Sequence, residues 1–271
     1  MQTPDIGALF RELLADLARE SEALWSLVAP LSLEQWGMPT PSAGWSIKDQ
    51  IAHLAYFDRQ TTSAVTNPGA FRADAQRLLA HGDDFVDHAV EELRHLRPAR
   101  ARRGFADARA SLLAVLREES PRQRVPWFGP DMSIMSAASA RLMETWAHGA
   151  DIADALDVPI KDGLRLRHIA HLGAATRNHS FSVRALAVPS TEVRLELTTD
   201  DRELWSYGPG DAPDLVRGSL LEFCLVVTQR RHVDDTSLQA SGPSARPWLE
   251  IAQAFAGPPT DASTRRGMAK R

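Results

Sequence analysis

The sequence predicts a mainly α-helical protein, with an N-terminal four-helix bundle in residues 1–158 and a smaller C-terminal α+β domain in residues 159–271. Three observations lead to this prediction. Long segments with apolar residues at helical spacing fill the first part, and strand-like alternation occurs after Pro159. A chain of 271 residues with 44% hydrophobic content can also build the core of one large or two medium domains.

The first part contains the helical patterns in a regular order. Ser46 is a good N-cap with Asp49 three residues later, which predicts a capping box at the start of the second helix. Long helices of this kind suit an up-and-down bundle whose site is formed by side chains from different helices. Residues 126–133, PWFGPDMS, are predicted to form a loop over the mouth of the bundle. The predicted helices span about residues 4–28, 46–66, 70–95 with Gly82 as a candidate break, 99–119 and 133–156.

The second part mixes both periodicities. Residues 191–199 and 203–208 alternate and predict a hairpin, while residues 211–232 fit a strand and turn or a helix with a long apolar face. Helices are predicted for residues 163–186 and 244–257.

Composition narrows the class of protein. The net charge is -4 and 24% of the residues are charged, so the balance gives no reason to expect a nucleic acid or a membrane surface as partner. Cys224 is the single cysteine, which excludes an intrachain disulfide and a multi-cysteine metal site. The N-terminus lacks a basic start followed by an apolar core, and no apolar stretch approaches membrane-spanning length. We therefore expect a cytoplasmic protein.

Glu144 and His148 lie four residues apart in the segment ETWAH, inside an Ala- and Met-rich run. This spacing places the carboxylate and the imidazole on one face of a helix, and Asp151 continues the same stripe. Because the stripe is partly apolar, we expect it to face inward, where a buried Glu and His need partners. His53, far upstream on the helix predicted for residues 46–66, would supply one.

Two imidazoles and one carboxylate are ligands that zinc accepts. Three protein ligands would leave positions open for water or substrate, as in catalytic metal sites. Two other interpretations stay open at this point. A Glu-x-x-x-His step also occurs as a solvated ion pair on exposed helices, and His53, at the margin of an apolar stripe, has the position of a satisfied core residue.

Two short segments resemble a known family. Residues 44–54, GWSIKDQIAHL, resemble the first metal-ligand helix of the DinB superfamily. The segment from Glu144, ETWAHGADI, resembles the E-x-x-x-H-x-x-D-[LI] motif of its mycothiol-dependent maleylpyruvate isomerase branch. The resemblance implies that His53, Glu144 and His148 bind a divalent metal, usually zinc, and it matches Asp151 to a recurrent acid one turn after the last ligand. The order and separation of the motifs and the two-part layout of the whole chain fit this family.

A third segment extends the resemblance into the second part. Residues 216–230 resemble the family's V-x-G-x-x-x-D-L-x-x-x-x-x-G-R segment, whose arginine contributes to the active site of the isomerase. The match implies that Arg230 binds a substrate carboxylate, with a surface salt bridge as the alternative. This chain departs from the pattern at Glu222 and Gln229, and it carries a second arginine, Arg231. Further segments, among them FCLVVTQRR and WLEIAQAFAGPP, resemble an actinobacterial subgroup of the family. The preference for arginine over lysine is expected from a GC-rich genome, which is typical of actinobacteria, the group that makes mycothiol.

The resemblance implies a metal-dependent enzyme that uses mycothiol as cosubstrate. A metal-held thiolate attacking an electrophilic carbon would give an S-conjugate if it stays attached, or cis-trans isomerisation if it leaves after bond rotation. We expect an S-transferase acting on a small electrophile, with an isomerase of the maleylpyruvate type as the alternative. A non-catalytic metal- or ligand-binding module and a metal-dependent hydrolase also stay open. The chain is expected to act as a monomer or a homodimer.

Overall fold

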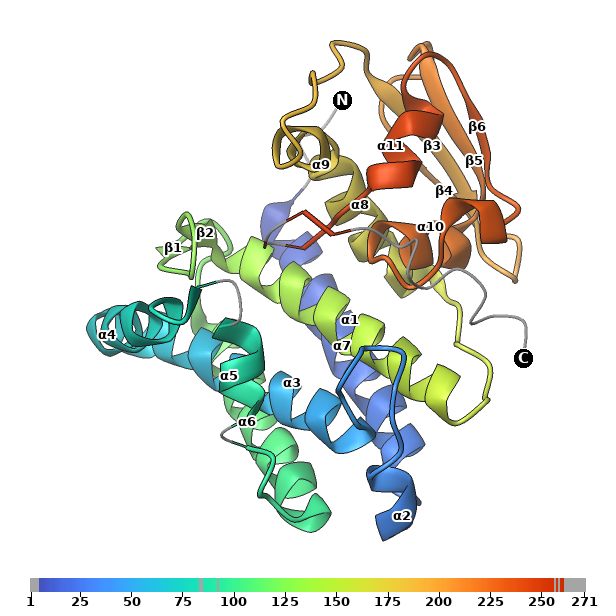
Figure 1. The fold of residues 1–271 in the computed structure, drawn as a ribbon. Coiled ribbons are helices and arrows are strands. Elements are labelled where there is room, and N and C mark those ends of the chain that lie inside the picture. The colour runs from blue at the N-terminus through green and yellow to red at the C-terminus, as the bar shows by residue number, and fades with distance from the viewer. Residues whose placement is uncertain (1–4, 83–84, 92, 256, 258, 261–271) are drawn as a thin grey trace. The chain divides into compact units, whose positions relative to one another are not determined.

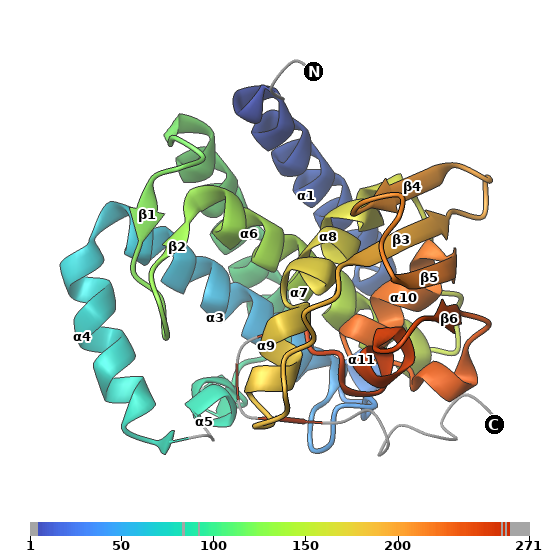
Figure 2. The ribbon, with the colours of Figure 1, turned by 90° about the horizontal axis from the view of Figure 1, so that it is seen from above.

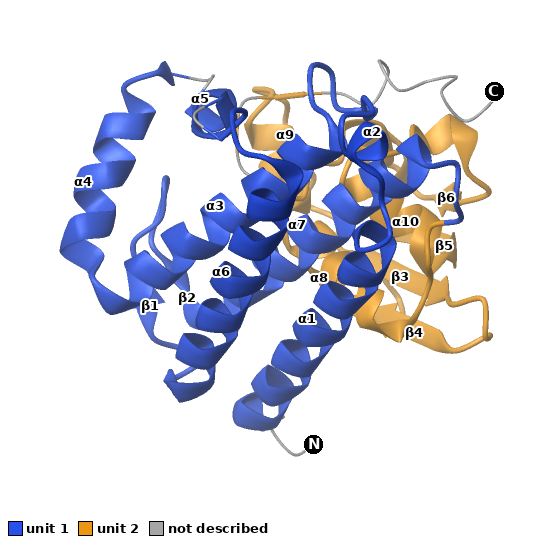
Figure 3. Cartoon of the chain, turned by 90° about the horizontal axis from the view of Figure 1, so that it is seen from below, with its two compact units in different colours: residues 1–159 blue, residues 160–271 orange. Residues whose placement is uncertain are grey.

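The computed structural model describes residues 5–82, 85–91, 93–255, 257 and 259–260 (Figure 1). The chain forms two compact units, residues 1–159 and residues 160–271 (Figure 3). Helices predominate and a four-stranded sheet belongs to the second unit, which confirms the predicted fold class. No described helix is both long enough and apolar enough to cross a membrane.

Four long helices form the bundle of the first unit: α1 (Ile6–Val28), α3 (Ile47–Thr66), α6 (Pro98–Glu118) and α7 (Ile134–Ala155). Helix α3 packs against α6 and α7, and α1 packs against the same two helices (Figure 2). The predicted helices match these to within about two residues at each end, the range over which helix ends fray. Residue 4, the predicted start of the first helix, lies outside the described residues.

The start of α3 confirms the predicted capping box. The backbone N–H of Asp49 donates to Oγ of Ser46 at 3.3 Å, and the backbone N–H of Ser46 donates to Oδ2 of Asp49 at 2.9 Å. These bonds satisfy amide groups that have no partner within the helix. They fix the residue at which the helix begins. His53 lies two turns after this start.

The segment predicted as one helix over residues 70–95 is broken. It contains α4 (Pro68–Leu79) and α5 (Phe85–Glu91). Gly82, the candidate break, has a φ of 69°. This left-handed conformation costs glycine little because it has no Cβ, and it is incompatible with a continuing α-helix. The short helix α2 (Leu33–Trp36) was not predicted.

The bundle core is apolar and draws on all four long helices. Leu24 of α1, Ile51 and Leu54 of α3, Phe105 of α6 and Ile152 of α7 are each at most 2% exposed. Burying side chains of this size contributes roughly 1.5–3 kcal/mol each relative to leaving them exposed. The packing holds α3 and α7 side by side as neighbours.

The second unit contains a mixed sheet in the order β4-β3-β5-β6. The predicted hairpin is confirmed: β3 (Val193–Thr198) and β4 (Leu204–Tyr207) are antiparallel. The segment over residues 211–232 forms a strand, β5 (Asp214–Ser219), followed by a helix, α10 (Leu220–Val227), and β5 pairs in parallel with β3. The strand β6 (Gln239–Ser241) was not predicted. A 3-10 turn, η3 (Val233–Asp235), precedes it.

Two predicted helices of this unit are shorter in the structure. The one over residues 163–186 divides into η2 (Leu164–Leu166), α8 (Arg167–Ala175) and α9 (Arg177–Ser182). Thr176 lies at the break, and its hydroxyl donates to the carbonyl of Leu172 at 2.9 Å, a bond that bends helices. The final helix, α11 (Ala245–Ile251), ends early because the next amides bond elsewhere: that of Gln253 donates to Oγ of Ser180 at 3.0 Å.

Candidate metal centre

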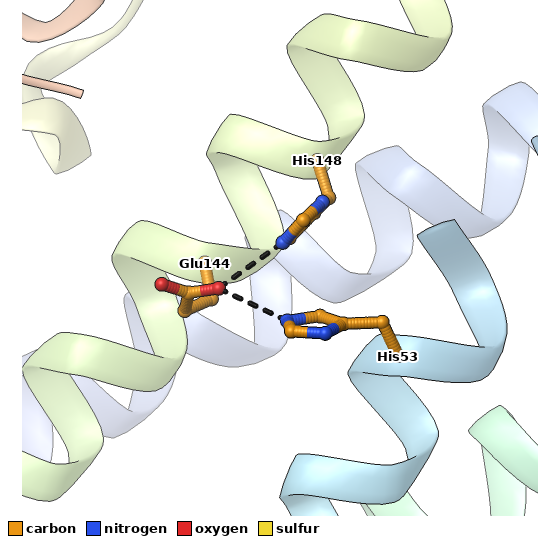
Figure 4. Close-up of side chains that lie close together, drawn as sticks. All are labelled: His53, Glu144 and His148. Carbon is orange, nitrogen blue, oxygen red and sulfur yellow. Dashed lines mark hydrogen bonds and ion pairs between the residues drawn. The ribbon is translucent and has the colours of Figure 1, made fainter. Parts of the chain in front are cut away.

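Neighbouring helices of the bundle position the three candidate ligands. Glu144 and His148 lie one turn apart on α7, and His53 lies on α3 (Figure 4). The two histidines are buried, at 6% and 7% exposure, whereas the Glu144 side chain is 24% exposed. The predicted inward face is therefore confirmed, and Glu144 is the most exposed side chain of the three.

One carboxylate oxygen joins the group. Oε2 of Glu144 lies 3.2 Å from Nε2 of His53 and 3.1 Å from Nε2 of His148. The two imidazole rings are 4.4 Å apart between centroids. One potential ligand atom from each residue lies within 4.8 Å of the others, so a single ion could contact all three. In the described part of the chain, no other group of three or more His, Cys, Asp and Glu side chains meets this criterion.

Burial and mutual contact set the protonation of two of these groups. The pKa of His53 is lowered to about 4: burial is the largest cause, the neighbouring His148 acts in the same direction, and Glu144 opposes both. Burial by itself would raise the pKa of Glu144, but its contacts with His148 and His53 outweigh the effect of burial and hold that pKa well below its usual range. At neutral pH the site therefore contains a neutral His53 and an ionised carboxylate, which are the protonation states that metal binding requires.

The donor set fits a divalent ion. Two imidazole nitrogens and a carboxylate oxygen suit zinc, and three protein ligands leave further coordination positions. Nδ1 of His53 is buried without a hydrogen-bond partner. No hydrogen bond at Nδ1 therefore holds the ring in an orientation that would turn Nε2 away from an ion. His53, Glu144 and His148 are the residues that could hold the ion.

Aromatic rings surround the two histidines. Trp45 stacks on His148, with 5.9 Å between centroids and 9° between planes, and lies 5.2 Å from the ring of His53. The indole N–H of Trp45 donates to Oδ1 of Asp87 at 2.8 Å, which ties the ring to α5. Phe57 packs on His53 from one turn further along α3, with 4.7 Å between centroids. These contacts restrict the rotation of both imidazoles.

The predicted loop over residues 126–133 extends this aromatic layer. Its residues 126–131 connect β1 (Arg124–Val125) to β2 (Met132–Ser133), and the two strands form a short hairpin, so the last two residues of the predicted loop are strand. Trp127 stacks on Phe71 of α4 at 5.7 Å, and Phe128 contacts Phe57 at 5.6 Å between centroids. The two loop aromatics therefore pack against the bundle on the side where Phe57 meets His53.

Several polar residues near the site were missed by sequence reasoning. Gln50 of α3 is fully buried, and its Oε1 accepts a hydrogen bond from Nδ1 of His148. Arg141, one turn before Glu144, donates from Nε to Asp58 at 3.0 Å, and Arg109 of α6 donates to the same carboxylate at 2.8 Å. A polar residue inside an apolar helical stripe was the available signal for Gln50, and a charged residue in such a position was the signal for Asp58.

Asp151 is fully buried on α7, one turn beyond His148. Its Oδ2 accepts a hydrogen bond from the hydroxyl of Ser42 at 3.1 Å. Ser42 belongs to the loop that precedes α3, so the contact joins that loop to α7. The role of Asp151 in turnover stays a prediction.

Arg230 belongs to the second unit, where it follows α10. Its Nη1 donates to the carbonyl of Thr228 at 2.7 Å, and Nη1 of Arg231 donates to the carbonyl of Arg230 at 2.7 Å. Gln229, which replaces the glycine of the resembled segment, has a φ of 59° and so keeps the left-handed backbone that glycine favours. The replacement of glycine by Gln229 therefore does not change the type of backbone conformation at this position. The role of Arg230 stays a prediction.

Comparisons with known proteins agree with the resemblance seen in the sequence. A family model described as the mycothiol maleylpyruvate isomerase N-terminal domain matches residues 17–153, which include all three candidate ligands. Uncharacterized proteins from two strains of Mycobacterium tuberculosis, H37Rv and CDC 1551, are each 44% identical to the chain over 246 residues, covering 91% of this chain and 96% of theirs.

Solved structures show the same fold. The crystal structure of the mycothiol-dependent maleylpyruvate isomerase matches with a TM-score of 0.56 at 17% identity, over 86% of this chain and 96% of that one. The structure of a mutant of that isomerase matches with a TM-score of 0.56 at 16% identity over the same shares. With the family match and the 44% identical relatives, the chain belongs to the family defined by the mycothiol maleylpyruvate isomerase N-terminal domain.

Proposed function

We propose that this protein is a metal-dependent enzyme that adds the thiol of mycothiol to a small electrophilic molecule. The observation that carries the proposal is the convergence of His53, Glu144 and His148, whose ligand atoms lie within 4.8 Å of one another on the core side of two helices. We propose zinc as the ion, because imidazole and carboxylate are among its usual ligands and no thiolate cluster is present among the described residues.

The chain's own residues would prepare the site electrostatically. The ionised Glu144 and the neutral imidazole of His53 together carry one negative charge, which would leave part of the charge of a divalent ion uncompensated. Such an ion, when bound, would stabilise the deprotonated form of a coordinated thiol at neutral pH. The aromatic contacts of Trp45 and Phe57 would limit the access of water to the two histidines.

Mycothiol as the thiol is supported by the family. The matching family model and the structurally similar isomerase both carry mycothiol in their names. We extend this cosubstrate to the present chain as part of the proposal. The second unit would complete the active site, with Arg230 binding an anionic group of the substrate through its planar guanidinium.

Two reactions share the first step, in which a carbon–sulfur bond forms between the thiolate and an electrophilic carbon. In an S-transferase that bond persists, and a leaving group departs or the adduct takes up the thiol proton. In an isomerase the same bond breaks again after rotation about the neighbouring carbon–carbon bond, and the thiol is recovered. We place the S-transferase first because this chain departs from the isomerase-like segment at Glu222 and Gln229. The family name favours the isomerase as second candidate.

The test combines metal analysis with product analysis. Purified protein is analysed for zinc and then mixed with mycothiol and either maleylpyruvate or a small alkyl halide. An S-transferase should consume thiol and form a conjugate in proportion, whereas an isomerase should convert maleylpyruvate without net loss of thiol. Both activities should disappear in His148→Ala and persist in His171→Ala, which removes an exposed imidazole of the second unit. Zinc binding without turnover of any electrophile would favour a binding module.

A further inference from the structure

We infer that Gln50 is a positioning residue that fixes the tautomer of His148, so that the lone pair of Nε2 points to the proposed ion. The inference rests on the proposed metal site, and it concerns hydrogen bonds of this chain alone. Gln50 lies on α3 and is 0% exposed, so its amide must be satisfied by protein groups.

A chain of hydrogen bonds sets the orientation of the Gln50 amide. The hydroxyl of Thr40 donates to the carbonyl of Trp45 at 2.9 Å, which uses its one proton. Thr40 can therefore only accept from Gln50, whose Nε2 lies 2.8 Å from Oγ1. This leaves Oε1 of Gln50 facing His148, and because a carbonyl oxygen only accepts, Nδ1 of His148 must carry the proton.

Thr40, at the end of this series of hydrogen bonds, is itself held in place by backbone contacts. The backbone N–H of Thr40 also donates to the carbonyl of Trp45, at 2.8 Å, and the next contact along, Pro39 with Ser46, is an antiparallel bridge. The loop before α3 is thus closed on itself directly beside the capping box of Ser46. The position of Thr40 is therefore fixed relative to the start of α3, and through Gln50 it sets the orientation of the His148 ring on α7.

The consequence concerns Nε2 of His148. When Nδ1 alone carries a proton, the ring presents a lone pair at Nε2, 3.1 Å from Oε2 of Glu144, which is an acceptor as well. Two acceptors at this distance repel unless a positive charge lies with them. The arrangement therefore suits an ion that contacts both atoms.

The two histidines differ in this respect. Nδ1 of His53 is buried without a hydrogen-bond partner, so no protein acceptor selects its tautomer. In the absence of an ion, His53 can satisfy Glu144 by donating from Nε2, at 3.2 Å. Gln50 therefore fixes the tautomer of His148 before an ion binds, whereas the tautomer of His53 can change on binding.

The first measurement is spectroscopic and uses the metal-free protein. Long-range proton–nitrogen correlation spectra distinguish the two neutral tautomers of a histidine. We expect His148 to be protonated at Nδ1 in the wild-type protein and at Nε2 in Gln50→Leu, where Glu144 becomes the remaining acceptor. A wild-type His148 protonated at Nε2 would mean that the Gln50 amide has the reverse orientation, and it would overturn the inference.

The second measurement is zinc affinity, determined by competition with a chelator. Gln50→Leu should bind zinc about 10- to 100-fold more weakly than wild type, the usual effect of removing a group that orients a metal ligand. Gln50→Glu, which keeps an acceptor, should restore the affinity. Gln60→Leu is the matched control, since it removes an amide from the same helix without a bond to either histidine. Melting temperatures of the metal-free variants show whether each is folded.

The possible failures are distinguishable. If the wild-type protein binds no zinc, the proposed function fails, whereas the tautomer measurement still tests the role of Gln50. If wild type and Gln50→Leu bind zinc equally and both are folded, the inference about Gln50 is wrong and the metal site stands. A loss in Gln50→Leu that Gln50→Glu does not restore would assign the effect to packing and would also contradict the inference.

Discussion

Oε2 of Glu144 lies 3.2 Å from Nε2 of His53, although 91 residues separate the two in the chain. The contact crosses from α7 to α3 and brings a neutral imidazole against an ionised carboxylate. Because His148 reaches the same oxygen from one turn further along α7, removing any one of the three should disturb the other two. The following predictions test the contact and the residues around it.

Zinc should stabilise the metal-free protein through these three residues. At a free zinc concentration about 100 times the dissociation constant, binding to the folded state alone adds about 2.7 kcal/mol to the free energy of unfolding. We expect His53→Ala and Glu144→Gln to lose this stabilisation and His171→Ala to keep it. Calorimetric or fluorescence-detected melting with and without zinc measures the difference, and an equal rise in Tm for His53→Ala and wild type would exclude His53 as a ligand.

The metal-free protein should lose stability as the pH falls from 6.5 to about 4. In this window an unfolded chain protonates His53 at its ordinary pKa of 6.5, whereas the folded protein, with a pKa of about 4, does not. The unfolded state therefore binds more protons, and folding becomes less favourable by about 3 kcal/mol in all. The depressed pKa of Glu144 acts in the same direction at still lower pH. Urea unfolding at a series of pH values should give a flatter profile for His53→Gln.

Asp151→Asn should keep zinc and lower turnover. The side chain is buried and accepts a hydrogen bond from Ser42, so the amide can preserve the packing while removing the charge and the ability to take up a proton. Zinc content and kcat are the measurements, with Asp154→Asn on the same helix as the control. Loss of zinc in Asp151→Asn would show that this residue helps to bind the metal.

Arg230→Lys should raise KM or lower kcat while zinc content and melting temperature stay unchanged. Lysine keeps the positive charge but lacks the planar fork that binds a carboxylate through two hydrogen bonds. Arg231→Lys, the adjacent substitution, is the comparison. Normal kinetics for Arg230→Lys beside an inactive Arg231→Lys would transfer the role to Arg231, and normal kinetics in both would remove this segment from the active site.

Asp58→Ala should destabilise the bundle strongly. Its carboxylate is 0% exposed and pairs with Arg109 and Arg141, so its removal leaves two buried guanidinium groups without their common counter-ion. Breaking a buried pair of this kind typically costs about 3 to 5 kcal/mol. Asp74→Ala, which removes a surface pair with Arg77, should change the free energy of unfolding by about 1 kcal/mol or less. Urea unfolding of both variants at neutral pH gives the comparison, and similar losses would contradict the prediction.

Local patterns in the sequence were sufficient for several features. Helical periodicity located the four long helices, the Ser46 and Asp49 pair located the start of α3, and alternation located the β3–β4 hairpin. The spacing of Glu144 and His148 predicted that they share a face. These features depend on residues close together in the chain, whose geometry is set by the period of the helix or the strand.

Other features required the tertiary structure. The sequence placed His53 on a helix of its own and named it as a third ligand through a family motif, but only the packing of α3 against α7 brings its Nε2 to Glu144. The bond from His148 to Gln50 and the pairing of Asp58 with two arginines join residues from different helices. Periodicity determines which face of a helix is buried, whereas the partner of a buried polar group depends on which helix lies opposite and in which register, and these are set by the packing of the whole core.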